Sequence, residues 1–277
     1  MTAIEIETSH GPARADLAVP GGDGSPSFLL VLTHGAGGSA SAPDLLAARD
    51  AALQAGGATA LVTQPYRVRG ARAPGSADRQ DQAWREIIAF LRRSPWFTPG
   101  EAPSAGEGLL RAGEMPLASG EVPSPARDVP PAAEKVPSAG AEASSAAADV
   151  PSGTGLPLIV GGRSNGARVA CRTASAVGAR GVIALAFPLH PPGRRVDAAR
   201  AGTSHPPTRE AELRAAAEGG VRVLVVNGDK DPFGIPVPGD AVQVVVLKGE
   251  THSLSRHPAA VTDVITGWLT GVVPLVR

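Results

Sequence analysis

The sequence is poor in several features that would restrict its location and partners. It has one cysteine, Cys171, so no disulfide can form within the chain, which suits a reducing compartment. Its 26 basic and 26 acidic residues cancel, so no overall field attracts nucleic acid. It lacks a run of about 18 apolar residues, which argues against a membrane span, and we see no signal peptide. We therefore expect a cytoplasmic protein without membrane or nucleic-acid partners.

Aromatic residues are also scarce, at 3% of the chain, whereas 43% of the residues are hydrophobic. The core must therefore be built mainly from Val, Leu, Ile and Ala. Residues 99–155 have almost no aliphatic bulk and repeat a Pro-, Ala- and Ser-rich unit, with eight acidic and three basic residues. Such a segment cannot bury a shared apolar face, and we expect a disordered insertion. The remaining residues, 1–98 and 156–277, would form a single domain.

Outside the insertion, short apolar runs alternate with helical patterns. Because the runs are apolar throughout rather than alternating, they predict a mostly parallel sheet covered by helices on both faces, an α/β fold. The expected strands are 4–8, 13–19, 28–34, 58–64, 157–161, 181–187, 221–227 and 242–248, the first two forming an antiparallel hairpin. The expected helices are 43–55, 78–93, 165–177, 208–220 and 258–270.

The strongest functional signal is the G-x-S-x-G pattern of residues 162–166, between a predicted strand and a predicted helix. In this context the pattern predicts a nucleophile elbow that exposes Ser164 at the end of its strand. The turn is so tight that a Cβ atom at Gly162 or Gly166 would clash with neighbouring backbone. Ser164 also sits at a helix N-terminus, where developing negative charge is stabilised.

A serine nucleophile needs a base, and the base needs an orienting acid. Sheets of this kind supply them in the order Ser, Asp or Glu, His. Asp229 and Asp231 follow the strand at 221–227, and His252 follows the strand at 242–248. We favour Asp231 as the acid because it lies farther from the turn glycine, with Asp229 capping the turn. Cys171 falls within a helix and is expected to be a packed core thiol.

Other groups are expected along the same edge of the sheet, because loops after parallel strands meet there. Backbone N–H groups of the glycine-rich turn after strand 28–34 and of the residue after the serine could form an oxyanion hole. Several arginines follow strand ends, where their guanidinium groups would suit an anionic substrate. Because 23 of the 26 basic residues are Arg, solvated surface is the safer interpretation of any one of them, and the anionic substrate is the alternative. The expected oxyanion-hole residues are Gly35, Ala36, Gly37 and Asn165, and the expected substrate-binding residues are His34, Arg67, Arg163, His190 and Arg194.

The sequence resembles the α/β-hydrolase-like group related to dienelactone hydrolases, which includes subunit 3 of the NSL complex and testis-expressed-protein relatives. The resemblance covers almost the whole chain except 99–155. It rests on LTHGAGG (32–38), QPYRVRGARAP (64–74) with DQAW (81–84), GGRSNGARVACR (161–172), FPLHPPGRR (187–195), and NGDKDPFG (227–234) with THSL (251–254). It implies an α/β-hydrolase fold and places nucleophile, acid and base at Ser164, Asp231 and His252. It does not imply a substrate.

The leading hypothesis is a serine hydrolase that cleaves a small ester, thioester or lactone through an acyl-enzyme, without metal or cofactor. The stretch after strand 181–187 is too short for a full cap domain, so the site should be open, which disfavours a peptidase. The competing hypothesis is a non-catalytic binding module or scaffold that uses the acidic, proline-rich insertion for docking. The insertion runs from a helix end to a strand start, so it should lie at the sheet edge opposite the site. Nothing in the sequence indicates an oligomeric state.

Overall fold

The computed structural model describes residues 2–21, 25–94, 97, 155–191 and 208–273. The predicted insertion 99–155, apart from Gly155, lies outside these residues, as does Arg194. The strands are β1 (Thr2–Ile6), β2 (Ala13–Ala18), β3 (Leu29–Thr33), β4 (Ala58–Thr63), β5 (Leu158–Arg163), β6 (Gly181–Leu185), β7 (Arg222–Gly228) and β8 (Val242–Leu247). The helices are α1 (Pro43–Gln54), α2 (Pro65–Val68), α3 (Ala77–Arg93), α4 (Asn165–Thr173), α5 (Glu210–Glu218) and α6 (Pro258–Val272).

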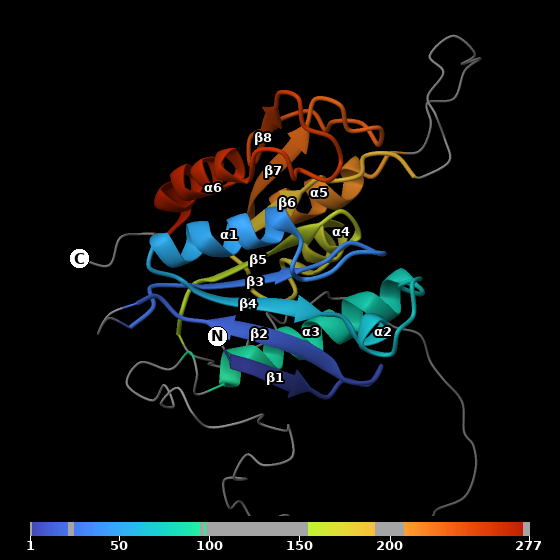
Figure 1. The fold of residues 1–277 in the computed structure, drawn as a ribbon, viewed down its shortest axis with the longest axis vertical. Helices are drawn as coiled ribbons and strands as arrows, with labels where there is room; N and C mark the ends of the chain where they lie inside the picture. The colour runs from blue at the N-terminus through green and yellow to red at the C-terminus, as the bar shows by residue number, and fades with distance from the viewer. Residues whose placement is uncertain (1, 22–24, 95–96, 98–154, 192–207, 274–277) are drawn as a thin grey trace, which may run out of the picture.

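The eight strands form one sheet in the order β1-β2-β4-β3-β5-β6-β7-β8 (Figure 1). β2 pairs antiparallel with both β1 and β4, and every pair from β4 to β8 is parallel. The predicted mostly parallel sheet and the opening hairpin are therefore confirmed. All residues of β3 and β6 are buried, because helices cover both faces of the central strands.

Two helical layers complete the core. Helices α1 and α6 pack together over one face of the sheet, and α3, α4 and α5 cover the other (Figure 1). The amphipathic helix α3 buries Trp84, Ile87 and Leu91, as the helical spacing of its apolar residues predicts. In the described residues, no helix is long and apolar enough to cross a bilayer.

The two largest differences from the elements expected from the sequence concern α2 and α4, and the other element ends shift by at most two residues. The segment after β4, expected to be a loop, contains the short helix α2, which begins with Pro65 at its first position. Helix α4 ends at Thr173, four residues earlier than expected, and turns lead from there to Gly178. The Thr173 hydroxyl donates to the carbonyl of Val169 at 2.8 Å, a local bond that competes with continued helix.

Ion pairs fasten α4 to the helices on either side of it. Arg172 donates two hydrogen bonds to Asp81 of α3, at 2.8 and 2.6 Å. Arg168 donates two to Glu212 of α5, at 2.9 and 2.5 Å. Such two-pronged guanidinium–carboxylate pairs fix orientation as well as distance. The helix that follows the predicted elbow is therefore held from both sides.

Candidate active site

Ser164 lies in the tight turn between β5 and α4, and its backbone is strained. Its φ of 53° and ψ of −111° are rare for a residue with a side chain. A Cβ added to Gly162 would lie 2.5 Å from the Thr33 carbonyl oxygen. One added to Gly166 would lie 2.5 Å from the same oxygen and 2.7 Å from that of His34. Both positions therefore require glycine, as expected from the sequence.

The structure brings the side chains of Ser164, Asp231 and His252 together. His252 Nε2 lies 2.9 Å from Ser164 Oγ, and His252 Nδ1 lies 2.8 Å from Asp231 Oδ2. The three residues follow β5, β7 and β8, so the common direction of these parallel strands delivers them to one edge of the sheet. The ring of Phe233 packs edge-on against His252, with centroids 4.5 Å apart.

The two candidate carboxylates behave differently. The Asp231 carboxylate is buried and accepts hydrogen bonds from the backbone N–H of Phe233 at 2.9 Å and from Asn227 Nδ2 at 3.3 Å. Asp229 is exposed, and its carboxylate accepts from the backbone N–H of Gly249 at 2.7 Å, joining the turns after β7 and β8. The geometry therefore puts Asp231, and not Asp229, against the imidazole.

Asn227 is a structural member of the site that the sequence analysis gave no role. Its fully buried amide accepts from the N–H of Phe187 at 2.9 Å and donates to the carbonyl oxygens of Phe187 at 3.1 Å and Gly234 at 3.2 Å, as well as to Asp231. A buried amide is costly unless it is hydrogen-bonded, so an asparagine within the apolar strand β7 was the available signal. Asn227 links the Asp231 turn to the end of β6.

The glycine-rich turn after β3 lies directly beside Ser164. A Cβ added to Gly35 would lie 3.3 Å from Ser164 Cβ, so only glycine allows this approach without displacement. The turn is closed by a hydrogen bond from the N–H of Gly38 to the carbonyl oxygen of Gly35 at 3.0 Å. Tyr66 Oη donates to the carbonyl oxygen of Ala36 at 3.1 Å. Among the described residues, no hydrogen-bond acceptor is assigned to the backbone N–H groups of Ala36 and Asn165.

Ser164 opens into a cavity of about 460 Å³. Pro188 and Phe233 provide apolar surface, and Arg168 and Arg209 bring cationic side chains that the sequence analysis did not select. Arg168 is paired with Glu212, whereas Arg209 donates to the carbonyl oxygen of Pro188 at 3.2 Å. Burial lowers the pKa of Arg209. The cavity is lined by Gly35, Ala36, Gly37, Gly38, Arg163, Ser164, Asn165, Arg168, Pro188, Arg209, Phe233 and His252.

His34, expected to bind substrate, is not brought into the cavity that contains Ser164. Its side chain is buried and lies outside the cavity lining. Its Nε2 accepts from the backbone N–H of Gln64 at 3.0 Å, and its Nδ1–H donates to the carbonyl oxygen of Gly35 at 2.8 Å. Burial lowers the pKa of His34, which favours this neutral form. The ring therefore fastens the glycine-rich turn to the start of α2.

Of the other expected substrate-binding residues, Arg67 and His190 lie outside the lining of this cavity, and Arg163 belongs to it. Arg67 and His190 do not line the cavity: Arg67 donates to the carbonyl oxygen of Ala71 at 3.3 Å, and His190 packs against Gly234. Arg163 does line the cavity, but its guanidinium group contacts other parts of the protein. Its Nη2 donates to the carbonyl oxygen of His252 at 2.8 Å, and its Nε lies 3.1 Å from Asp44 Oδ2.

Asp44 carries a buried charge behind the site. It lies in the first turn of α1 and is fully buried, and Oδ2 meets Arg163 without a well-aligned hydrogen bond. Burial raises the pKa of Asp44 to about 6, although the charge of Arg163 opposes the rise. Cys171 is also buried, and burial raises its thiol pKa far above the ordinary value, so it is a packed thiol as expected.

Comparison with known proteins agrees with this architecture. Residues 124–259 match a family described as "Alpha/beta hydrolase domain". A serine hydrolase without a lid from Xanthomonas campestris has a TM-score of 0.60 at 15% identity, with 100% of this chain and 96% of that one covered. A dienelactone hydrolase from Anabaena variabilis has a TM-score of 0.58 at 14% identity, covering 98% and 97%. Est1E from Butyrivibrio proteoclasticus has a TM-score of 0.58 at 13% identity, covering 99% of each.

No curated protein sequence matched the chain. The protein has the α/β-hydrolase fold, with an eight-stranded, mostly parallel sheet. In the described residues, no group of three or more His, Cys, Asp or Glu side chains is arranged to hold a metal ion.

Proposed function

We propose that the protein is a serine hydrolase that cleaves an ester, thioester or lactone through an acyl-enzyme intermediate. The observation that carries this proposal is the unbroken hydrogen-bonded series from Ser164 Oγ through His252 to Asp231, with contacts of 2.9 and 2.8 Å. A hydroxyl, an imidazole and a buried carboxylate in this order are what acyl transfer to serine requires. The serine hydrolase, the dienelactone hydrolase and Est1E with the same fold favour carboxylic ester chemistry.

In the first half of the proposed reaction, Ser164 Oγ attacks the acyl carbon while His252 Nε2 takes the hydroxyl proton. Asp231 accepts the Nδ1–H bond and stabilises the imidazolium. Negative charge then develops on the acyl oxygen, beside the N–H groups of the turn at 35–37 and of Asn165. One such donor contributes about 10²–10³ in rate. His252 returns its proton to the departing alcohol or thiol, leaving the acyl group on Ser164.

In the second half, water attacks the acyl carbon while His252 Nε2 takes a proton from it. His252 then returns this proton to Ser164 Oγ as the bond between Oγ and the acyl carbon breaks and the carboxylic acid leaves. The hydrogen bonds that Asp231 receives from Phe233 and Asn227 hold its carboxylate in one orientation through both halves. The edge-on contact of Phe233 limits rotation of the His252 ring. This preorganisation supports the proposal because reorienting the imidazole in each catalytic cycle would raise the activation barrier of the reaction.

The substrate we propose is a small molecule with an anionic group. Arg209 supports this, because its described hydrogen bonds go only to backbone carbonyl oxygens and none of its described contacts is an ion pair with a carboxylate. We also place the protein within the group related to dienelactone hydrolases that includes NSL-complex subunit 3, on the motifs quoted above. A cytoplasmic location fits the single free thiol of Cys171.

The deciding experiment is labelling with a fluorophosphonate, combined with an ester and lactone panel. Wild type should be labelled and should hydrolyse members of the panel, and Ser164→Ala should do neither. Ser175→Ala, at an exposed serine in the turn after α4, is the matched control and should behave as wild type. If folded wild type is neither labelled nor active, the protein is not a serine hydrolase, and the binding-module hypothesis replaces it.

A further inference from the structure

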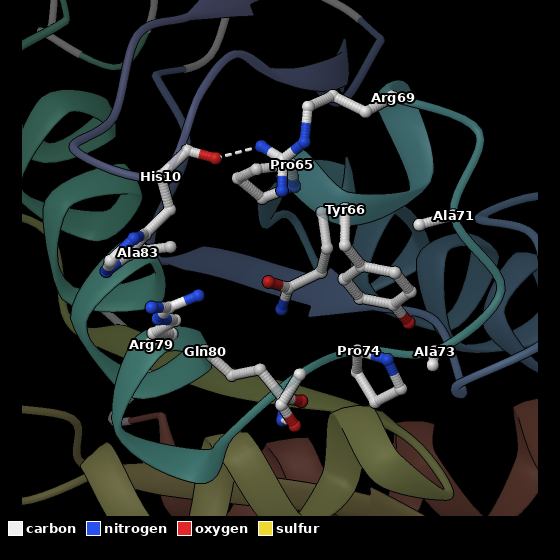
Figure 2. Close-up of a pocket in the computed structure, with 12 residues that line it drawn as sticks. His10, Pro65, Tyr66, Arg69, Ala71, Ala73, Pro74, Arg79, Gln80 and Ala83 are labelled. Carbon is white, nitrogen blue, oxygen red and sulfur yellow. Dashed lines mark hydrogen bonds between the residues drawn. The ribbon is translucent and has the colours of Figure 1, made fainter.

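A second cavity, of about 260 Å³, lies beside the first turn of α3 and is separate from the one that contains Ser164 (Figure 2). Its walls come from the β1–β2 turn, from α2 with the segment that follows it, and from α3. None of its lining residues lines the Ser164 cavity. The lining is His10, Gln64, Pro65, Tyr66, Arg69, Ala71, Ala73, Pro74, Gly75, Arg79, Gln80 and Ala83.

The charged side chains of this cavity are all basic. Arg69 and Arg79 are exposed, and no lining residue carries a carboxylate. Arg69 donates to the backbone carbonyl oxygen of His10, and among the described residues neither arginine forms an ion pair. Figure 2 shows Arg79 and His10 on one side, opposite Tyr66, Ala73 and Pro74. Two guanidinium groups without an acidic partner in one cavity favour binding of an anion there.

The buried part of the cavity contains a polar group that lacks a partner. Gln64 is only 2% exposed, and its Nε2 has no hydrogen-bond partner among the described residues. A buried donor without an acceptor costs free energy, so such groups are normally satisfied by protein, water or ligand. Gln64 Nε2 has almost no accessible surface, so its amide has to turn toward the cavity before an oxygen acceptor of a bound molecule can meet it. Pro65, Tyr66 and Ala83 add buried apolar surface near it.

We propose that this cavity binds a small organic carboxylate that carries a second oxygen acceptor. The carboxylate meets Arg69 and Arg79 at the exposed side, and a carbonyl or hydroxyl oxygen of the same molecule accepts from Gln64 Nε2. The short carbon chain between them packs against Tyr66 and the prolines. This division of charged, apolar and hydrogen-bonding surface matches such an acid better than a bare inorganic anion, which would leave the apolar wall unused.

The cavity is connected to the candidate active site through two hydrogen bonds. Gln80 Oε1 accepts from Asn165 Nδ2 at 2.6 Å, next to Ser164. Tyr66 Oη donates to the carbonyl oxygen of Ala36 at 3.1 Å, in the glycine-rich turn. A bound acid contacts both Gln80 and Tyr66. Its binding therefore affects the hydrogen bonds that hold Asn165 and Ala36, the two sides of the proposed oxyanion hole. This link rests on the proposed function, whereas the binding does not.

The test is calorimetric titration of the full chain with three matched probes: 4-oxopentanoate, pentanoate, which lacks the ketone, and 2-pentanone, which lacks the carboxylate. We expect affinity to fall in that order. Arg79→Gln should lower the affinity for 4-oxopentanoate and for pentanoate about ten- to hundredfold, because it removes a charged hydrogen-bond donor. Gln64→Leu should remove the preference for 4-oxopentanoate over pentanoate. Arg85→Gln, an exposed arginine of α3 outside the cavity, should bind as wild type.

Several results would overturn the proposal. It fails if 2-pentanone binds as well as the acids, if inorganic phosphate binds more tightly than 4-oxopentanoate, or if Arg79→Gln matches Arg85→Gln. It also fails if Arg209→Gln abolishes binding, because the acid would then occupy the Ser164 cavity. Because the titration needs no turnover, a protein that binds the acid but is not labelled at Ser164 keeps this proposal and loses the proposed function.

Discussion

Replacing the buried Asp44 with asparagine should change how stability depends on pH. Burial raises the pKa of Asp44 from 3.8 to about 6. An acid whose pKa rises on folding holds its proton more tightly in the folded state. Its contribution to stability is therefore fully present below about pH 4 and is lost as the pH rises to about 6. One pKa unit corresponds to about 1.4 kcal/mol, so the loss amounts to about 3 kcal/mol.

The Asp44→Asn variant has an amide at this position, which stays neutral at every pH. The variant therefore does not lose this stability as the pH rises. The attraction of Arg163 is already part of the wild-type pKa of about 6, and in the variant Arg163 faces the same neutral amide at every pH, so there it adds only a constant offset. The charges that face Asp44 are those of Arg163 and of His252 when protonated. The free energy of unfolding of wild type minus that of the variant should therefore fall by about 3 kcal/mol between pH 4 and pH 7.

Urea denaturation of both proteins at four or five pH values measures this difference directly. Asp50→Asn, on the same helix but with a half-exposed side chain, is the matched control and should follow wild type across the range. A difference between wild type and Asp44→Asn that is flat with pH would refute the reasoning. A difference that grows with pH would mean that the ion pair with Arg163 outweighs burial.

Three further predictions concern the elbow, the acid and the insertion. Gly166→Ala should lower the free energy of unfolding by about 3 kcal/mol, measured in urea, because its Cβ meets two backbone oxygens; Gly37→Ala, where nothing lies within 4 Å, should change it little. Asp231→Asn should lower kcat in the ester assay by about 10⁴-fold, and Asp229→Asn should not; the reverse ranking would reassign the acid. Deleting 99–155 should preserve folding by circular dichroism and esterase activity, and a folded but inactive deletion would contradict its placement away from the site.

The sequence allowed the sheet to be predicted because its signals are local. Apolar runs such as 28–34 and 181–187 predict both a strand and its burial. The glycines two residues before and two residues after Ser164 indicate a tight turn. The chain order of Ser164, Asp231 and His252 then follows from the parallel strands, since each residue comes just after a strand end. That three such residues lie at one edge of the sheet could be predicted without coordinates.

Side-chain direction could not be predicted in the same way. A position after a strand end brings His34 and Arg67 to the correct edge, but packing turns both away from the cavity. Arg163 lies in the elbow as expected, yet its guanidinium holds Asp44 and the backbone of His252, which are far from it in the sequence. Arg209 enters the cavity from the start of α5, a helix that the sequence places without indicating which residues approach the pocket.

The residues that line the cavity around Ser164 come unequally from two segments of the chain, one before and one after residues 95–154. Ser164, Asp231 and His252 all lie after residue 155, whereas the segment up to residue 94 contributes only the glycine-rich turn to the lining. Exchanging the first segment between related proteins would therefore replace the glycine-rich turn beside Ser164 and leave Ser164, Asp231 and His252 unaltered. Most of the lining is therefore encoded in the same portion of the gene as the candidate triad, and the turn proposed to hold the developing negative charge is encoded in the other.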